Sequence, residues 1–130
     1  MNSPAYDVAN ILESTAFGLG VIGTDIFIGR EPASPDNCIT VFDTGGYEPE
    51  SSDVVYELPT VMIKVRNKTY TNGYAKIAAI KAALHKAANI AEGTTRYIAI
   101  WAQSDIIPLG YDDNNRALFS VNFRIHRTGV

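Results

Sequence analysis

The sequence predicts an α+β fold, with a single antiparallel or mixed sheet of about five strands and two helices packed on one face. Two segments place apolar residues at the three- and four-residue spacing of a helix, and five segments alternate apolar and polar residues as strands do. Most links between these segments are as short as those of hairpins. The predicted order is α-β-β-β-α-β-β, in one domain that spans residues 1–130.

The first helix is predicted over residues 4–17. Ser3 supplies a capping hydroxyl, and Pro4 suits the first helical position. Apolar residues such as Ile11 and Leu12 then recur at helical spacing, and glycines after position 17 end the pattern.

Three strands are predicted before the second helix, over residues 24–30, 37–43 and 56–66. Residues 31–36 contain two prolines and are expected to turn, and residues 44–53 are a loop by their glycines, proline, serines and acids. The residues of the third strand that are expected to face the core are Val61, Ile63 and Val65. Lys64 and Arg66 are then expected on its other face.

The second helix is predicted over residues 73–91, which form the most strongly periodic segment of the chain. Its expected buried stripe is Ile77, Ile80, Leu84, Ala87, Ala88 and Ala91. Gly93 follows as a suitable stop signal.

Two further strands are predicted over residues 96–103 and 117–127. In the first of them Ile98 and Ile100 are expected to share a face. Residues 106–116 are predicted as a loop with a tight polar tip at 112–115. The last strand has the cleanest alternation of the chain, which is typical of a half-buried antiparallel strand with one wet face.

The charges are sorted along the chain although the net charge is only −3, from 11 basic and 14 acidic residues. Residues 31–63 carry seven acids and no base, and residues 64–96 carry seven bases and one acid. Two interpretations remain open: two solvated surfaces that happen to be sorted, or an acidic region that meets the basic region of a neighbouring copy. The near-neutral total gives no general attraction to nucleic acid or to an anionic membrane.

No catalytic, cofactor-binding or metal-binding constellation is expected, and the chain is predicted not to be an enzyme. His85 and His126 are interpreted as surface or interface residues, and Cys38 as a small buried residue of a strand. The three glycines at 18, 20 and 23 follow a helix and precede a strand, the reverse of a dinucleotide fingerprint. The adjacent acids at 112–113 suit a hairpin tip better than a calcium loop.

Nucleic-acid recognition and membrane insertion are both disfavoured. Lys64, Arg66 and Lys68 alternate at a strand end with Tyr70 and Tyr74 after them, but a solvated strand face explains the same pattern. No run of about 18 apolar residues occurs. The first residues lack the features of a secretion signal, and a single cysteine suits a reducing compartment.

The chain from Cys38 onward resembles a known family. A strand runs into Thr44-Gly45-Gly46, an acidic loop follows, and Tyr56-Glu57-Leu58-Pro59-Thr60 opens a strand that ends in Val65-Arg66-Asn67. The chain then closes with Asp113-x-x-Arg116-x-x-Phe119-Ser120-x-Asn122-Phe123-x-Ile125. This arrangement is similar to the tail terminator, or minor capsid (tail completion), proteins of long-tailed bacteriophages. Asn67 stands where the family pattern suggests glycine.

The resemblance implies a structural virion protein at the head-tail junction, assembled in the host cytoplasm. Such a protein forms a homo-oligomeric ring, commonly a hexamer, on the end of the tail tube and stops its polymerisation. The ring then offers its other surface to head-completion or neck proteins, and genome DNA passes through its channel without sequence-specific binding. The alternatives are a head-completion or neck (connector) protein of the same kind of virus, and a small α+β ligand-binding domain or enzyme.

The expected subunit or tail interface follows from the ring and the sorted charges. One side would be the acidic loop, through Tyr47, Glu48, Glu50 and Asp53. The opposite side on the next copy would be Arg66, Lys68 and Tyr70.

Overall fold

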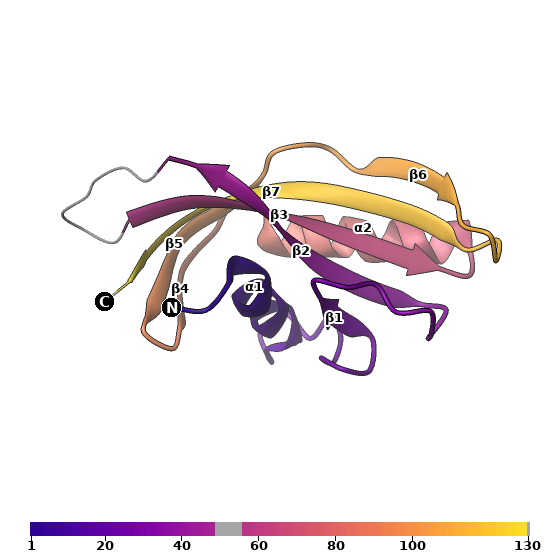
Figure 1. Cartoon of the computed structure of the whole chain (residues 1–130), viewed down its shortest axis with the longest axis horizontal. Coiled ribbons are helices and arrows are strands. Elements are labelled where there is room, and N and C mark those ends of the chain that lie inside the picture. Colours follow the sequence, from indigo (N-terminus) through magenta and orange to yellow (C-terminus); the bar gives the residue numbers. More distant parts are fainter. Residues whose placement is uncertain (49–55, 130) are drawn as a thin grey trace.

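The computed structural model describes residues 1–48 and 56–129, which form two helices and one seven-stranded sheet (Figure 1). The helices are α1 (Pro4–Glu13) and α2 (Tyr70–Leu84). The strands are β1 (Ile26–Ile28), β2 (Cys38–Tyr47), β3 (Tyr56–Asn67), β4 (Ala87–Glu92), β5 (Thr95–Ala102), β6 (Ile107–Tyr111) and β7 (Ala117–Gly129).

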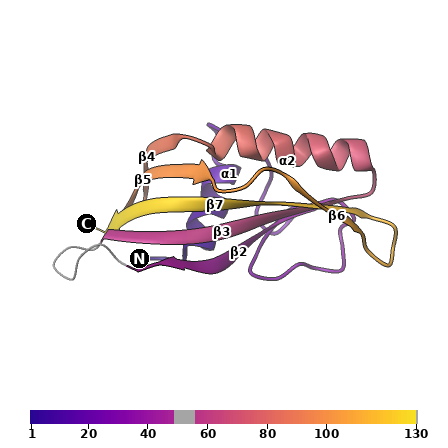
Figure 2. The same ribbon diagram turned by 90° about the horizontal axis from the view of Figure 1, so that it is seen from above.

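The sheet is mixed and curled, and both helices lie on one side of it (Figures 1 and 2). Its strand order is β1-β2-β3-β7-β5-β4, and β6 pairs with the free part of the β7 edge. The α+β prediction is therefore confirmed, whereas the expectation of about five strands is wrong. The two additional strands are β4 and β6.

The core lies between the helices and one face of the sheet. The helices contribute buried residues such as Leu12 and Ile77, and β3 contributes its predicted inward residues. The odd-numbered residues of β7 from Ala117 to Ile125 are all fully buried, which confirms the predicted alternation.

Helix α1 begins where it was predicted but ends earlier, at Glu13. The Ser3 hydroxyl accepts a hydrogen bond from the Tyr6 backbone N–H, and the Asp43 carboxylate accepts one from that of Ala5 at 2.9 Å. Ser14 adopts an extended conformation (ψ 157°) and its hydroxyl donates to the Ile11 carbonyl, which ends the helix before the glycines.

Strands β1 and β2 run parallel, so residues 29–37 cross back from the end of β1 to the start of β2 instead of forming a hairpin. Strand β2 also continues to Tyr47, through residues predicted as loop. Gly45 and Gly46 form a bulge, both at positive φ, and a Cβ at Gly46 would lie 2.5 Å from the Leu58 carbonyl oxygen. The two glycines therefore mark a bulged strand and not its end.

Helix α2 covers Tyr70–Leu84, so the predicted helix started too late and was too long at its C-terminal end. Lys86 takes a left-handed conformation (φ 68°), and the alanines that follow belong to edge strand β4, paired with β5. Alanines spaced three and four apart fit a helix stripe, but the left-handed turn separates them from Leu84. Gly93 serves the turn between β4 and β5.

The inward residues of β5 also differ from the prediction, because a bulge between Tyr97 and Ala99 shifts the alternation. Tyr97 and Ile100 are fully buried, whereas Ile98 is only partly so. The next segment, predicted as loop, contains β6. Its tight tip at 112–115 is confirmed, because the Asp112 N–H donates to the Arg116 carbonyl and closes the β6–β7 hairpin.

A polar network ties α1 to the end of the sheet. The Tyr97 hydroxyl donates to the Asp7 carboxylate at 2.6 Å, and both residues are buried. Arg127 donates to the Tyr97 hydroxyl, to the Asn2 carbonyl and to Glu57. Burial, with the hydrogen bond to Asp7, raises the pKa of the Tyr97 phenol far above its ordinary value.

Removing the Tyr97 hydroxyl should destabilise the fold. In Tyr97→Phe the buried Asp7 carboxylate loses its hydrogen-bond donor, at an expected cost of about 1–3 kcal/mol in the free energy of unfolding. Urea denaturation would measure this cost. The control is Tyr6→Phe, because Tyr6 is an exposed tyrosine of α1, the helix that carries Asp7, and its replacement should change the stability little. Equal stabilities of the two variants would contradict the role given to the network.

Gly73 should resist replacement although it lies inside a helix. Alanine has the higher helix propensity by about 1 kcal/mol, but a Cβ here would lie 2.9 Å from the buried ring of Phe119. We therefore expect Gly73→Ala to lower the stability by about 1–3 kcal/mol, again measured by urea denaturation. A variant more stable than the native chain would show that the ring can move aside.

Candidate assembly interface

The sheet face that lacks helices is covered over only part of its area. Residues 31–36 lie over the half that contains Lys64 and Arg66, held there by Glu31, which pairs with both cations. The other half carries side chains from β2, β3, β5 and β7 without a covering element among the described residues.

Arg66 is not a surface residue, contrary to the prediction. Only 2% of it is exposed, and its guanidinium donates to the carbonyls of Pro35 and Asp36, at 2.7 and 3.3 Å, as well as pairing with Glu31. The side chain therefore anchors the link between β1 and β2. Period-two alternation placed it correctly on the face opposite the core but could not indicate that a loop covers that face.

Many of the sorted charges pair with one another inside one subunit. Among the described acids of residues 31–63, those that have partners within the chain are Glu31, Asp36, Asp43 and Glu57. Their partners include both basic side chains of β3, Lys64 and Arg66. Glu48, in contrast, is exposed and has no ion pair among the described residues.

The other predicted interface residues lie at two opposite ends of the sheet. Tyr47 and Glu48 stand at the end where β2 stops, whereas Lys68 and Tyr70 stand where β3 passes into α2 (Figure 2). All four side chains are exposed. The 12 residues of β3 separate these ends by about 36 Å. Glu50 and Asp53 lie outside the described residues.

Sequence reasoning missed a cluster on the open half of the sheet face, which we call the Arg124 cluster: Tyr47, Tyr56, Trp101, Arg124 and His126. The Arg124 guanidinium carbon lies 4.5 Å from the centre of the Tyr47 ring and 5.5 Å from that of Trp101. The His126 ring meets Trp101 and Tyr56 edge-on, and its Nδ1 atom is 2.7 Å from the Tyr56 hydroxyl. The even-numbered polar face of β7 was the signal, but only the strand order shows which rings stand beside it.

A second exposed group, the Phe119 rim, is apolar: Tyr70, Tyr74, Ile107, Leu109 and Tyr111. Tyr70 and Tyr74 pack edge-on against Phe119, and β6 pairs with β7 beside the same residue. Every residue of β6 is exposed. Exposed apolar side chains gathered in this way are typical of protein-protein contact surfaces.

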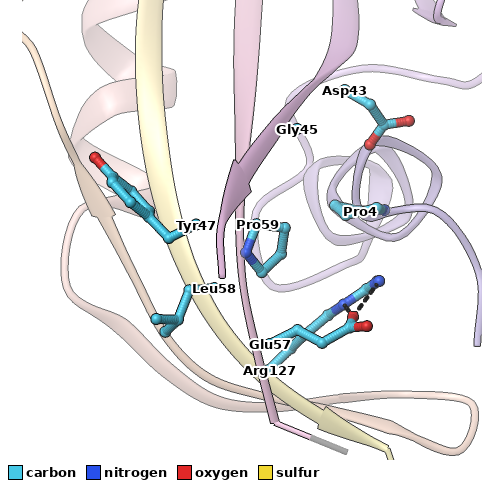
Figure 3. A pocket seen from close by; sticks show the side chains of 8 residues that line it. All are labelled: Pro4, Asp43, Gly45, Tyr47, Glu57, Leu58, Pro59 and Arg127. Carbon is cyan, nitrogen blue, oxygen red and sulfur yellow. Dashed lines mark hydrogen bonds and ion pairs between the residues drawn. The ribbon is translucent and has the colours of Figure 1, made fainter. Parts of the chain in front are cut away.

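A cleft of about 260 Å³ opens beside the start of α1, between the ends of β2 and β3 (Figure 3). Its ionisable groups already serve the fold: Glu57 pairs with Arg127 at 2.7 Å, and Asp43 caps α1. The Tyr47 side chain points away from these groups (Figure 3). The cleft thus offers no free acid–base pair.

Residues 1–48 and 56–129 contain no group of three or more potential metal ligands. Cys38 is buried, and this burial raises the pKa of its thiol, as expected of a small core residue. In the same described residues, no helix has the length and apolarity needed to cross a membrane.

Comparisons with known proteins bear on the fold and on the family of the chain. A chain from a structure described as the virion of a native gene transfer agent particle superposes with a TM-score of 0.75 at 15% sequence identity, covering 98% of this chain and 96% of that one. At this identity the likeness shows the fold. No curated protein sequence matches the chain. The model of the bacteriophage tail terminator protein family matches residues 15–128. The chain belongs to this family and is a structural protein of the virion tail, not an enzyme.

Proposed function

We propose that the chain forms a closed head-to-tail ring, a hexamer, on the end of the tail tube. The ring stops polymerisation of the tube and then presents its other surface to head-completion or neck proteins. Genome DNA passes through its channel without sequence-specific binding, and assembly takes place in the host cytoplasm. Membership of the tail terminator family supports the position at the tail.

The observation that carries the ring is the separation of the exposed interface residues. Tyr47 and Glu48 cannot reach Lys68 and Tyr70 of the same subunit, because the length of β3 lies between them. The opposite charges of Glu48 and Lys68 can therefore meet only between two copies of the chain. A contact between two different surfaces of identical copies repeats head to tail, and it closes into a ring when the rotation between copies divides a full turn.

The termination step then depends on differential binding. The ring fits the last ring of tube subunits through one of its annular surfaces, and its opposite annular surface lacks the features that recruit another tube subunit. The Phe119 rim supplies exposed apolar area for such contacts with other virion proteins.

Charge reversal should test the contact between copies. Glu48→Lys and Lys68→Glu should each weaken ring formation, because each places like charges opposite one another, by about fivefold for such exposed charges. The double variant should recover most of the loss. Native mass spectrometry or sedimentation velocity would measure the ring, with the exposed Lys86→Glu as the control.

Recovery in the double variant would support this pairing, whereas two single variants that assemble like the native chain would reject it.

The position on the tube can be tested directly. Protein added to polymerising tail tubes should shorten them and should be visible by electron microscopy as an extra ring at one end. A head-completion protein would instead leave the tube length unchanged and bind to DNA-filled heads. That result would replace the terminator function by the neck alternative.

A further inference from the structure

Arg124 differs from the buried arginines of the described chain, because it has no carboxylate partner. The ion pairs of those arginines are Arg66–Glu31, Arg116–Asp112 and Arg127–Glu57. Arg124 is half-buried, forms no ion pair within residues 1–48 and 56–129, and leaves its Nε atom buried without a hydrogen-bond partner. A guanidinium partly removed from water without a counter-charge costs free energy, which an incoming anion would recover.

The rest of the Arg124 cluster holds this guanidinium in place. Tyr47 and Trp101 flank it, and the Tyr47 hydroxyl accepts a hydrogen bond from the Gln103 amide at 2.6 Å. His126, fixed by Tyr56, packs against the Trp101 ring. Because these rings are already fixed in the free subunit, their side chains lose little conformational entropy when a partner binds. Tryptophan, tyrosine and arginine are also the residue types that dominate the energy of protein-protein contacts.

The occupant that fits is a single carboxylate on a protein. An arginine fork binds a carboxylate with two parallel hydrogen bonds. A nucleic acid would need several cations spaced along its phosphates, and Lys64, another cation of this sheet face, is already paired with Glu31.

Asp113 is, among the described carboxylates, the one that is best placed to reach such a site on another copy. It is exposed at the β6–β7 tip and has no partner among the described residues, whereas Asp112 next to it is bound by Arg116. The tip stands at the end of the sheet where Lys68 and Tyr70 lie, and the Arg124 cluster includes Tyr47, beside Glu48 (Figure 1). The contact that joins Glu48 to Lys68 therefore brings Asp113 towards Arg124.

We propose that the Arg124 cluster of each subunit binds the Asp113 carboxylate of the next subunit, and that this ion pair anchors the ring. The inference rests on the proposed ring and names its central contact. Two pairs of opposite polarity, Arg124 with Asp113 and Glu48 with Lys68, would fix the register of the two surfaces. A shift of one copy along the other would place like charges together.

The test uses Trp101, the only tryptophan of the chain, as a reporter inside the site. Its fluorescence should change with protein concentration, in parallel with the molecular mass measured by sedimentation velocity. Arg124→Gln and Asp113→Asn should each raise the concentration needed for both changes by about tenfold or more. The double reversal Arg124→Asp with Asp113→Arg should recover most of that loss, and thermal unfolding would confirm that each variant folds.

Arg96→Gln is the matched control, because Arg96 is an exposed arginine of β5 without a described partner. It should associate like the native chain. The proposal is overturned if Trp101 fluorescence does not depend on concentration, or if the double reversal fails to recover. It is also overturned if a short DNA duplex changes the fluorescence where a second copy does not.

Failure of this contact can be told apart from failure of the proposed function. If Arg124→Gln and Asp113→Asn still form rings and shorten tail tubes like the native chain, the terminator function stands and this contact is wrong. If the two variants lose self-association but the native protein leaves tube length unchanged, the contact stands and the terminator function is wrong.

Discussion

The pairing of β7 along both of its edges is the constraint on which the rest of the structure depends. One edge of this 13-residue strand binds β3, and the other binds β5 and then β6. Because side chains alternate along a strand, the register of β7 decides at once what fills the core and what stands on the open face. Phe119 and Phe123 enter the core, and Arg124 meets its flanking rings, through the same alternation. A one-residue slip would bury the arginine and expose the phenylalanines.

The sequence predicted the class, the start of α1 and the inward residues of β3 and β7, because these follow from local periodicity and capping. It failed where one local pattern fits two structures. The alanines after Leu84 suit a helix as well as an edge strand, and Gly45-Gly46 suits a loop as well as a bulge. Tertiary pairing decides both cases. Only part of the candidate site could be predicted from the sequence, for the same reason. Exposed Tyr47 and Lys68 could be found from the sequence, but the partners of Arg66 and the rings around Arg124 come from strands distant in the chain.

The sorted charges acquire two separate roles in the folded chain. The pairs Glu31–Lys64 and Glu57–Arg127 hold a crossing link and a terminal segment in place, and both are at least half-shielded from water, where ion pairs are least screened. The charges that remain available for contacts between copies are fewer than the acid and base counts of the sequence suggest. They are a few exposed charges at opposite ends of one sheet. An assembly protein needs this division. If the same charges could pair either within or between subunits, ion pairs inside the monomer would compete with the ion pairs that join the copies.

The position of the chain ends has a practical consequence for the study of this protein. Arg127 binds the Asn2 carbonyl, so Asn2 and Gly129 lie at the same end of the sheet as Tyr47 (Figure 1). An affinity tag or a fluorescent fusion joined to either end would emerge beside the Arg124 cluster and could occlude it.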